Sequence, residues 1–176
     1  MQSVKIGKLL RQLAVLISRN FQLIWNQKLT LGSLILQAPL MVLVIKLMGE
    51  PDCFTSNLIN IGSRKVLFIV CAMASFMGLL NSYREICKDR EIIFREASVG
   101  VSLLATVLSK AITLFLVEAV QAGILTAGFV EIIHIPQNHL LLDTNVEIFI
   151  TIFLLMAASS AMGLLVSASL KSSEAA

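Results

Sequence analysis

Charged side chains are scarce in this sequence. Only 14% of its 176 residues are Asp, Glu, Lys or Arg, whereas 57% are hydrophobic and the mean hydropathy is +0.87. A soluble domain carries about 25% charged residues, so this balance argues against one and favours an integral membrane protein. The net charge of +3 is small, and no basic tract interleaves with aromatic residues. We therefore expect no nucleic-acid partner.

Motifs for nucleotide binding and catalysis are also missing. The sequence has no G-x-x-x-x-G-K-[ST] loop to hold ATP phosphates, and neither H-E-x-x-H nor G-x-S-x-G occurs. Cys53, Cys71 and Cys87 show no metal or redox spacing, and an odd number argues against a closed disulfide framework. His134 and His139 lie in one segment, EIIHIPQNH, but no third ligand is suggested by spacing. We expect this chain not to be an enzyme, and we expect it to hold no metal or cofactor.

Four apolar runs are long enough to cross a bilayer, which takes about 20 residues at about 1.5 Å each. They predict spans near residues 29–48, 66–83, 105–130 and 147–170. The third run is longer than a bilayer needs, so residues 101–110 are expected at or below the interface. Pro39 in the first span is tolerable, because neighbouring groups can satisfy the carbonyl that it frees. The sequence thus predicts an all-α membrane domain over residues 29–176.

Residues 1–28 precede the first span and carry a different pattern. Apolar residues recur at helical spacing from Ile6 to Ile24, and Lys5, Lys8 and Arg11 fall on the opposite side. This predicts an amphipathic helix near residues 5–26 that lies on the inner membrane surface. An ordinary helix packed on a soluble domain is the alternative. The interfacial interpretation is preferred because the helix runs straight into a span.

Basic residues are distributed unevenly among the segments outside the spans. The N-terminal segment, the loop after the second span and the tail hold ten of them: Lys5, Lys8, Arg11, Arg19, Lys28, Arg84, Lys88, Arg90, Arg95 and Lys171. The loop over residues 131–147 has none, and the loop after the first span has two. The positive-inside rule therefore predicts that both termini and the 84–100 loop are cytoplasmic.

The 84–100 loop concentrates charge of both signs. Residues Arg84 to Glu96 carry four bases and four acids. On a helix they would form one stripe of Arg84, Lys88, Glu91 and Arg95, and a second stripe of Glu85, Asp89 and Glu96. An apolar side of Ile86, Cys87, Ile93 and Phe94 would anchor the loop against the spans, so that both charged stripes face the cytosol. A solvated loop that only fixes topology would explain the bases but not the acids.

Several short motifs, taken in order, carry a family resemblance. They are LILQAPL (34–40), REICKDREIIFREASVG (84–100), LSKAI (108–112) and GLLVSASLKSSEAA (163–176). Together they resemble type-2 ATP-binding cassette (ABC) export permeases, and most of all those related to the white-brown-complex (G subfamily) half-transporters. The resemblance covers nearly the whole chain. Gln121 fits a glutamine common in the family, whereas Glu118 stands where an apolar residue is expected.

The resemblance implies both a mechanism and partners. It implies that the 84–96 segment is a coupling helix that docks on an ABC ATPase, which holds ATP and Mg, and that two permease copies pair. The expected function is export of a lipid-like or amphipathic solute, across what we take to be the cell membrane. Such permeases have six spans, so a chain with four is expected to be a fragment, a truncated frame or a split gene. A non-transporting membrane scaffold or accessory subunit is the alternative, and an intramembrane enzyme ranks third.

Two further features lie inside the predicted spans. Glu118 in the third span should face other helices or a water-filled path, because a carboxylate in hydrocarbon is costly. It is either a substrate or proton contact, a hydrogen-bond partner near Gln121, or a protonated and structurally paired glutamate. In the fourth span the small residues Ala157, Ser159, Ala161 and Gly163 recur at spacings of four. They predict close helix packing.

Overall fold

The computed structural model describes residues 2–54, 61–135 and 142–170, and within these ranges the chain forms helices without strands. The elements are α1 (Gln2–Asn26), α2 (Lys28–Met48), α3 (Ile61–Ser82), a 3-10 turn η1 (Cys87–Asp89), α4 (Arg90–Ser98), α5 (Leu103–Ile132) and α6 (Thr144–Ser169). The all-α fold class predicted from the apolar runs is thereby confirmed.

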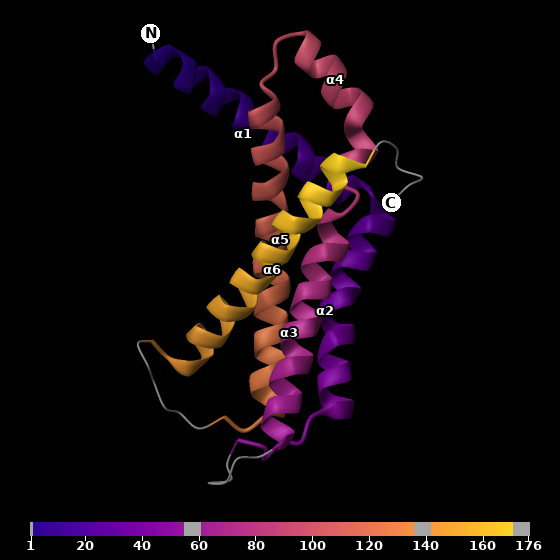
Figure 1. Cartoon of the computed structure of the whole chain (residues 1–176), viewed down its shortest axis with the longest axis vertical. Coiled ribbons are helices and arrows are strands. Elements are labelled where there is room, and N and C mark those ends of the chain that lie inside the picture. Colours follow the sequence, from indigo (N-terminus) through magenta and orange to yellow (C-terminus); the bar gives the residue numbers. More distant parts are fainter. Residues whose placement is uncertain (1, 55–60, 136–141, 171–176) are drawn as a thin grey trace.

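The long helices form an elongated bundle (Figure 1). Helices α2, α3 and α5 run side by side, and α6 crosses them obliquely. Helix α6 packs on α3 and α5, while α1 packs along α5. Helix α1, helix α4 and the C-terminal end of α6 all lie at one end of the bundle (Figure 1). We call this end the charged end, because it carries the 84–96 segment.

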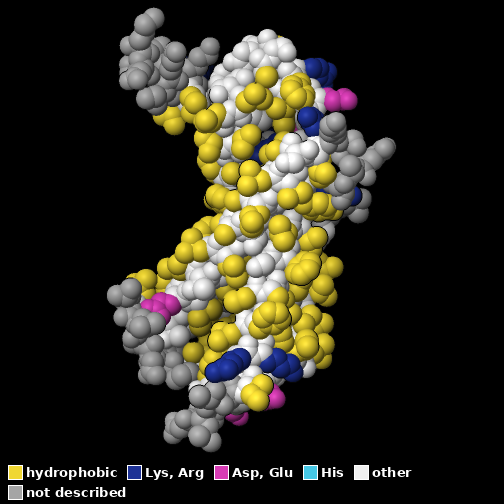
Figure 2. Space-filling view, in the orientation of Figure 1, with side chains coloured by type: hydrophobic (Ala, Val, Ile, Leu, Met, Phe, Trp, Pro, Cys, Tyr) yellow, Lys and Arg dark blue, Asp and Glu magenta, His cyan; other side chains and the backbone are white. Residues whose placement is uncertain are grey.

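The helices have the lengths and composition of membrane spans. Three helical stretches are long and apolar enough to cross a bilayer: Ile61–Ser98, Leu103–Ile132 and Thr144–Ser169. Helix α2 adds a shorter apolar helix, Gly32–Met48. Large apolar side chains cover much of the outside, as Figure 2 shows in yellow. Such a surface is stable in hydrocarbon rather than in water, which fits an integral membrane protein.

Several helices extend beyond the spans expected from hydropathy. Helix α3 begins at Ile61 and not at 66, α5 covers 103–132 and not 105–130, and α6 begins at Thr144 and not at 147. Apolar run length measures only the part that matches the hydrocarbon, whereas backbone hydrogen bonding continues into polar turns. At about 1.5 Å per residue α5 is about 45 Å long, so its ends pass beyond a hydrocarbon layer of about 30 Å.

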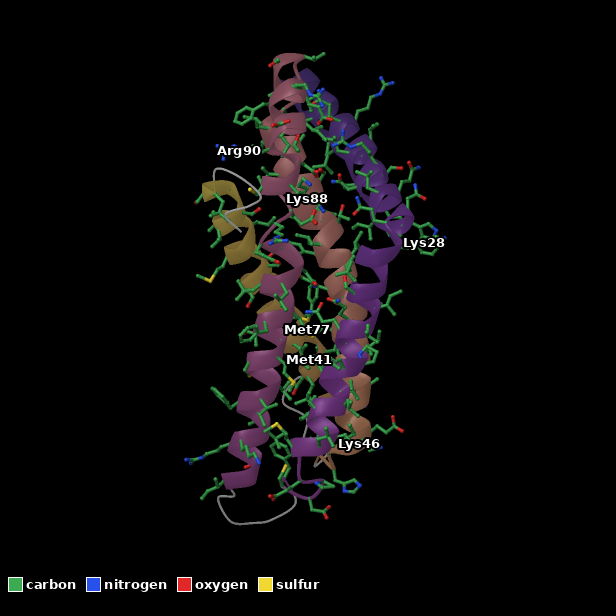
Figure 3. All side chains as sticks on the ribbon, turned by 90° about the vertical axis from the view of Figure 1, so that its right-hand side faces the viewer. Lys28, Met41, Lys46, Met77, Lys88 and Arg90 are labelled. Atoms are coloured by element: carbon green, nitrogen blue, oxygen red, sulfur yellow. The ribbon has the colours of Figure 1, made fainter. Side chains whose placement is uncertain are left out.

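The interior of the bundle is narrow and built around a few side chains. Ala38, Ile45, Met77, Leu125 and Met156 are fully buried in one apolar cluster that joins α2, α3, α5 and α6. Met41 and Met77 lie near the middle of the bundle, and Lys46 lies at the opposite end from Lys88 and Arg90 (Figure 3).

Candidate functional site

The 84–96 segment is not one helix. Backbone turns over residues 83–86 lead into η1, and α4 begins only at Arg90. A continuous helix over this segment, as assumed in the sequence analysis, is therefore wrong. The reason lies in α6, where the hydroxyl oxygen of Ser167 accepts hydrogen bonds from the N–H groups of Ile86 and Cys87, both at 3.0 Å. A side chain from another helix thus satisfies donors that open a helical turn, as a capping residue would.

The three acids Glu85, Asp89 and Glu96 turn towards the bundle. Lys110 of α5, only 4% exposed, places its Nζ 2.5 Å from Asp89 Oδ2 and 3.6 Å from Glu85 Oε2. Glu96 forms an ion pair with Arg19 of α1. The expectation that this stripe faces the cytosol is therefore wrong, because bases from other helices neutralise it.

The other stripe is exposed. Arg84, Lys88, Glu91 and Arg95 all have exposed side chains, and Lys88 also pairs with Glu85. The apolar residues divide differently from the expectation. Cys87 is buried and Ile86 and Ile93 are half-buried, but Phe94 is 57% exposed and Ile92 is 42% exposed. Phe94 is thus wrongly placed by the sequence analysis. It lies on the outer face, with the Arg90 guanidinium 5.6 Å from its ring centre.

We call Glu91, Ile92, Phe94 and Arg95 the α4 outer face. This face sits on a segment that hydrogen bonds and ion pairs fix at several points. Arg90 donates to the carbonyl of Leu170, just past the end of α6, at 2.5 Å. Asn20 of α1 donates to the hydroxyl of Ser109 of α5 at 3.1 Å, next to the Arg19 ion pair. Helix α4 is therefore bonded to α1 and to the residue just past α6, and Asp89 immediately before it is paired with α5.

The connection from α4 to α5 is equally defined. Gly100 has a φ of +95°, a backbone conformation that favours glycine. Gln12 of α1 donates from Nε2 to the Gly100 carbonyl, and its Oε1 accepts from the Ser102 N–H, each at 3.4 Å. Helix α1 therefore contacts the turn that sets the direction of α4 relative to α5.

Gln121 joins three helices in the middle of the bundle. Its Oε1 accepts from Asn81 Nδ2 of α3 at 2.7 Å, and its Nε2 donates to the Leu34 carbonyl of α2 at 2.9 Å. Pro39 has no N–H to give to the Ile35 carbonyl, so Gln121 bonds beside the stretch of α2 that proline weakens. Gln121 is occupied by these two partners and does not bond to Glu118.

Glu118 is fully buried between α5 and α6. The hydroxyl of Ser160 donates to Glu118 Oε2 at 3.2 Å, whereas Oε1 has no hydrogen-bond partner among the described residues. The carboxyl group therefore faces other helices and not lipid, as its cost in hydrocarbon requires.

Small residues line the crossing of α3 and α6. A Cβ added to Gly78 would overlap the Met156 carbonyl, and one added to Gly163 would overlap the Ser82 hydroxyl. Such contacts bring two backbones close together. Ser159 and Gly163 are buried at this crossing, Ala157 is half-buried, and Ala161 is exposed and lies outside it.

The opposite end of the bundle carries the histidine segment. His134 Nδ1 lies 2.9 Å from Asp52 Oδ1, and both side chains are largely exposed. His139 lies outside the described residues, as does Lys171 of the tail.

Sequence reasoning missed three partners of the 84–96 segment: Lys110, Arg19 and Ser167. The signal for Lys110 was present, because it is the single base inside the apolar sequence that forms α5. Arg19 and Ser167 gave no such signal, since their sequence surroundings do not set them apart. Their roles depend on how α1 and α6 cross the segment.

The family model described as ABC-2 type transporter matches residues 11–176, which is nearly the whole chain. No curated protein and no solved structure matches it. On the extent of that match, the chain belongs to the ABC-2 type transporter family.

Proposed function

We propose that this chain moves a lipid-like or amphipathic solute out of the cell and receives the work of ATP hydrolysis through the α4 outer face. Family membership makes it the membrane-embedded permease part of an ABC transporter, which is not itself catalytic, with an ABC ATPase as its general partner. The proposal adds the docking surface, the class of solute, the cell membrane as location, and pairing of two copies. ATP and Mg would bind on the ATPase.

One observation carries the docking proposal. The α4 outer face presents exposed charge beside exposed Phe94 and Ile92, while the acids flanking it are tied to α1 and α5. Aromatic and Arg side chains are enriched at protein interfaces, and Glu91 and Arg95 can set register. A partner that pushes on this face would move the ends of three helices together.

The direct test changes the α4 outer face alone. Arg95→Glu combined with Phe94→Ala should reduce recovery of the cognate ABC ATPase with the permease. It should also lower solute-stimulated ATP hydrolysis, because truncating an interface anchor costs about 2 kcal/mol or more. Membrane insertion should persist, since the bases at this end remain in large excess. Lys65→Glu, on an exposed position at the opposite end, is the matched control.

Two results would count against the proposal. Equal recovery of the ATPase with the variant and the control would remove docking through α4. If the ATPase is recovered normally but no amphipathic solute tested changes the rate of ATP hydrolysis, the result would favour a non-transporting accessory subunit.

A further inference from the structure

A groove of about 700 Å³ opens beside the 84–96 segment, between α2, α3 and α5. Its wall includes Leu36, Leu40 and Leu80, all more than half exposed, and its polar end is formed by Arg84, Glu85 and Lys88. In Figure 3, Lys88 lies towards the charged end and Met41, another lining residue, lies near the middle of the bundle. The groove is therefore polar at one end and apolar along its length, and its leucines are exposed on the outside of the bundle.

Two hydrogen-bond donors in this groove have no hydrogen-bond partner in the part of the chain that the structure describes. The Nε2 atom of Gln37 is buried and makes no hydrogen bond to the described residues. Arg84 has no ion pair within the described ranges, and its guanidinium lies 5.2 Å from the centre of the Tyr83 ring. An unsatisfied buried donor is costly, and a guanidinium binds an anionic oxygen well. Neither donor has an acceptor among the described residues, so the buried amide of Gln37 and the exposed guanidinium of Arg84 can each bind an oxygen of a bound molecule.

The sign of the charge follows from the remaining groups at the polar end. Glu85 is an acid in the groove, but its carboxylate already pairs with Lys88 and lies 3.6 Å from Lys110. Asp89 is paired with Lys110 at 2.5 Å. Both acids are thus paired, and Arg84 is a base at this end of the groove that has no ion pair with any described acid. The Arg84 guanidinium would repel the headgroup of a cationic amphiphile, whereas it would form an ion pair with the headgroup of an anionic one.

We propose that this groove binds an anionic amphiphile that enters sideways from the adjoining leaflet. Its acidic headgroup contacts Arg84, a polar oxygen below the headgroup accepts from Gln37, and its acyl chain lies along Leu36, Leu40 and Leu80. The acyl chain stays in contact with apolar groups as it moves from the bilayer into the groove, because the exposed leucines adjoin the bilayer. This inference rests on the proposed function of amphiphile export. It adds the charge of the solute, the residues that select it and the side of the bundle that admits it.

The test uses two photoactivatable lipids with the same diazirine-bearing chain, lysophosphatidylglycerol and lysophosphatidylcholine. The protein is purified in phosphatidylcholine nanodiscs without ATPase. Mass spectrometry then measures the labelling of residues 33–41 by each lipid. The anionic probe should label this stretch about fivefold more than the zwitterionic one, since a basic side chain near an anionic headgroup contributes a factor of that order. Arg84→Gln should abolish the preference, and Arg64→Gln, at the other end of α3, should preserve it.

Gln37→Leu gives a second and independent measurement. Removing an unsatisfied donor should raise the melting temperature of the lipid-free protein while lowering labelling by both probes. Gln22→Leu, on an exposed position of α1, is its control. Equal labelling by the two probes in the unmodified chain, or a preference that survives Arg84→Gln, would overturn the proposal. Because no ATPase is present, that result would leave docking through the α4 outer face intact.

Discussion

Lys110 illustrates what a single residue decides in this chain. A helical projection of residues 84–96 contains no information on neighbouring helices. It therefore predicts that every charged side chain in the segment faces water. Lys110 lies in an apolar helix with a 4% exposed side chain, and it needs a counter-charge because a buried ammonium group is costly. Asp89 supplies that charge at 2.5 Å. The inward direction of the acids thus follows from the needs of α5, which local periodicity cannot show.

Cys53 yields a prediction about reactivity. The residue is buried in the turn after α2, and burial raises the pKa of its thiol above the ordinary value. Thiolate is the reactive form, so an impermeant maleimide should label Cys53 slowly at pH 7 and faster as pH rises. The comparison uses two variants with one cysteine each: one keeps Cys53 alone, and the other has Glu50→Cys after all native cysteines are changed to serine. The labelling rate of Cys53 should be well below that of the cysteine at position 50. Similar rates at pH 7 would show that Cys53 is accessible.

Glu118 yields a second prediction at this scale. Its one described partner is the Ser160 hydroxyl, so we expect the residue to act as a structural acceptor. Glu118→Gln should retain the fold and solute-stimulated ATP hydrolysis, because the amide oxygen can accept the same bond. Glu118→Leu should lose about 1 kcal/mol of stability, the order found for hydrogen bonds between membrane helices. Loss of transport in a stable Glu118→Gln protein would instead assign the carboxyl group a functional role.

At the scale of elements, α4 is a short helix whose position is fixed by contacts with its neighbours. The presence of a charged segment outside the spans could be expected from the sequence, because eight charges in 13 residues cannot lie in hydrocarbon. The division of this segment into η1 and α4 could not be expected from the sequence. It depends on hydrogen bonds to Ser167 and Leu170, which belong to the distant α6 region. The small-residue spacing in the last span shows the same limit. It indicated a close contact, but only the crossing with α3 selects Ser159 and Gly163 over Ala161.

The link between α4 and α5 can be measured by a double-mutant cycle. Asp89→Asn should destabilise the protein by about 1–3 kcal/mol, because Lys110 loses its closest counter-charge while remaining buried. Lys110→Met in the Asp89→Asn background should recover most of that loss, since the buried ammonium group is gone. Thermal unfolding in detergent measures these two variants and Lys110→Met alone, which completes the cycle. Glu91→Gln on the α4 outer face is the control and should change little, and additive effects of the two core substitutions would show that the pair is uncoupled.

At the scale of the whole molecule, composition and apolar run length were sufficient to predict an all-α membrane protein, and the motif order was sufficient to predict an ABC-2 permease. The prediction of the fold class depends on whether side chains prefer water or hydrocarbon, and the prediction of the family depends on short local motifs. The site depends instead on pairs far apart in the chain, such as Arg19 with Glu96 and Asn81 with Gln121. The groove between α2, α3 and α5 likewise exists only when these helices are assembled.

The two ends of the bundle differ in charge, and this difference predicts the orientation of the molecule. The elements at the charged end (Figure 1) carry the bases Arg11, Arg19, Arg84, Lys88, Arg90 and Arg95 together with the acids Glu85, Asp89, Glu91 and Glu96. The helix ends and turns at the opposite end carry the acids Glu50, Asp52, Glu131, Asp143 and Glu147 and the bases Lys46, Arg64 and Lys65. Basic residues are retained on the cytoplasmic side, and acids contribute little to orientation. The charged end should therefore be cytoplasmic, where an ATPase can reach α4.

Two engineered cysteines in a cysteine-free chain test this orientation in intact cells. Glu50 follows α2 and Ser98 is the last residue of α4, and both are exposed. The end of α2 and helix α4 lie at opposite ends of the bundle (Figure 1). An impermeant maleimide added outside should label Glu50→Cys at once, and Ser98→Cys only after permeabilisation. Arg11→Gln and Arg95→Gln together should leave this pattern unchanged, because other bases at the charged end still dominate. The reverse pattern would place α4 outside the cell, where no ATP-driven partner could dock on it, and would exclude the proposed coupling.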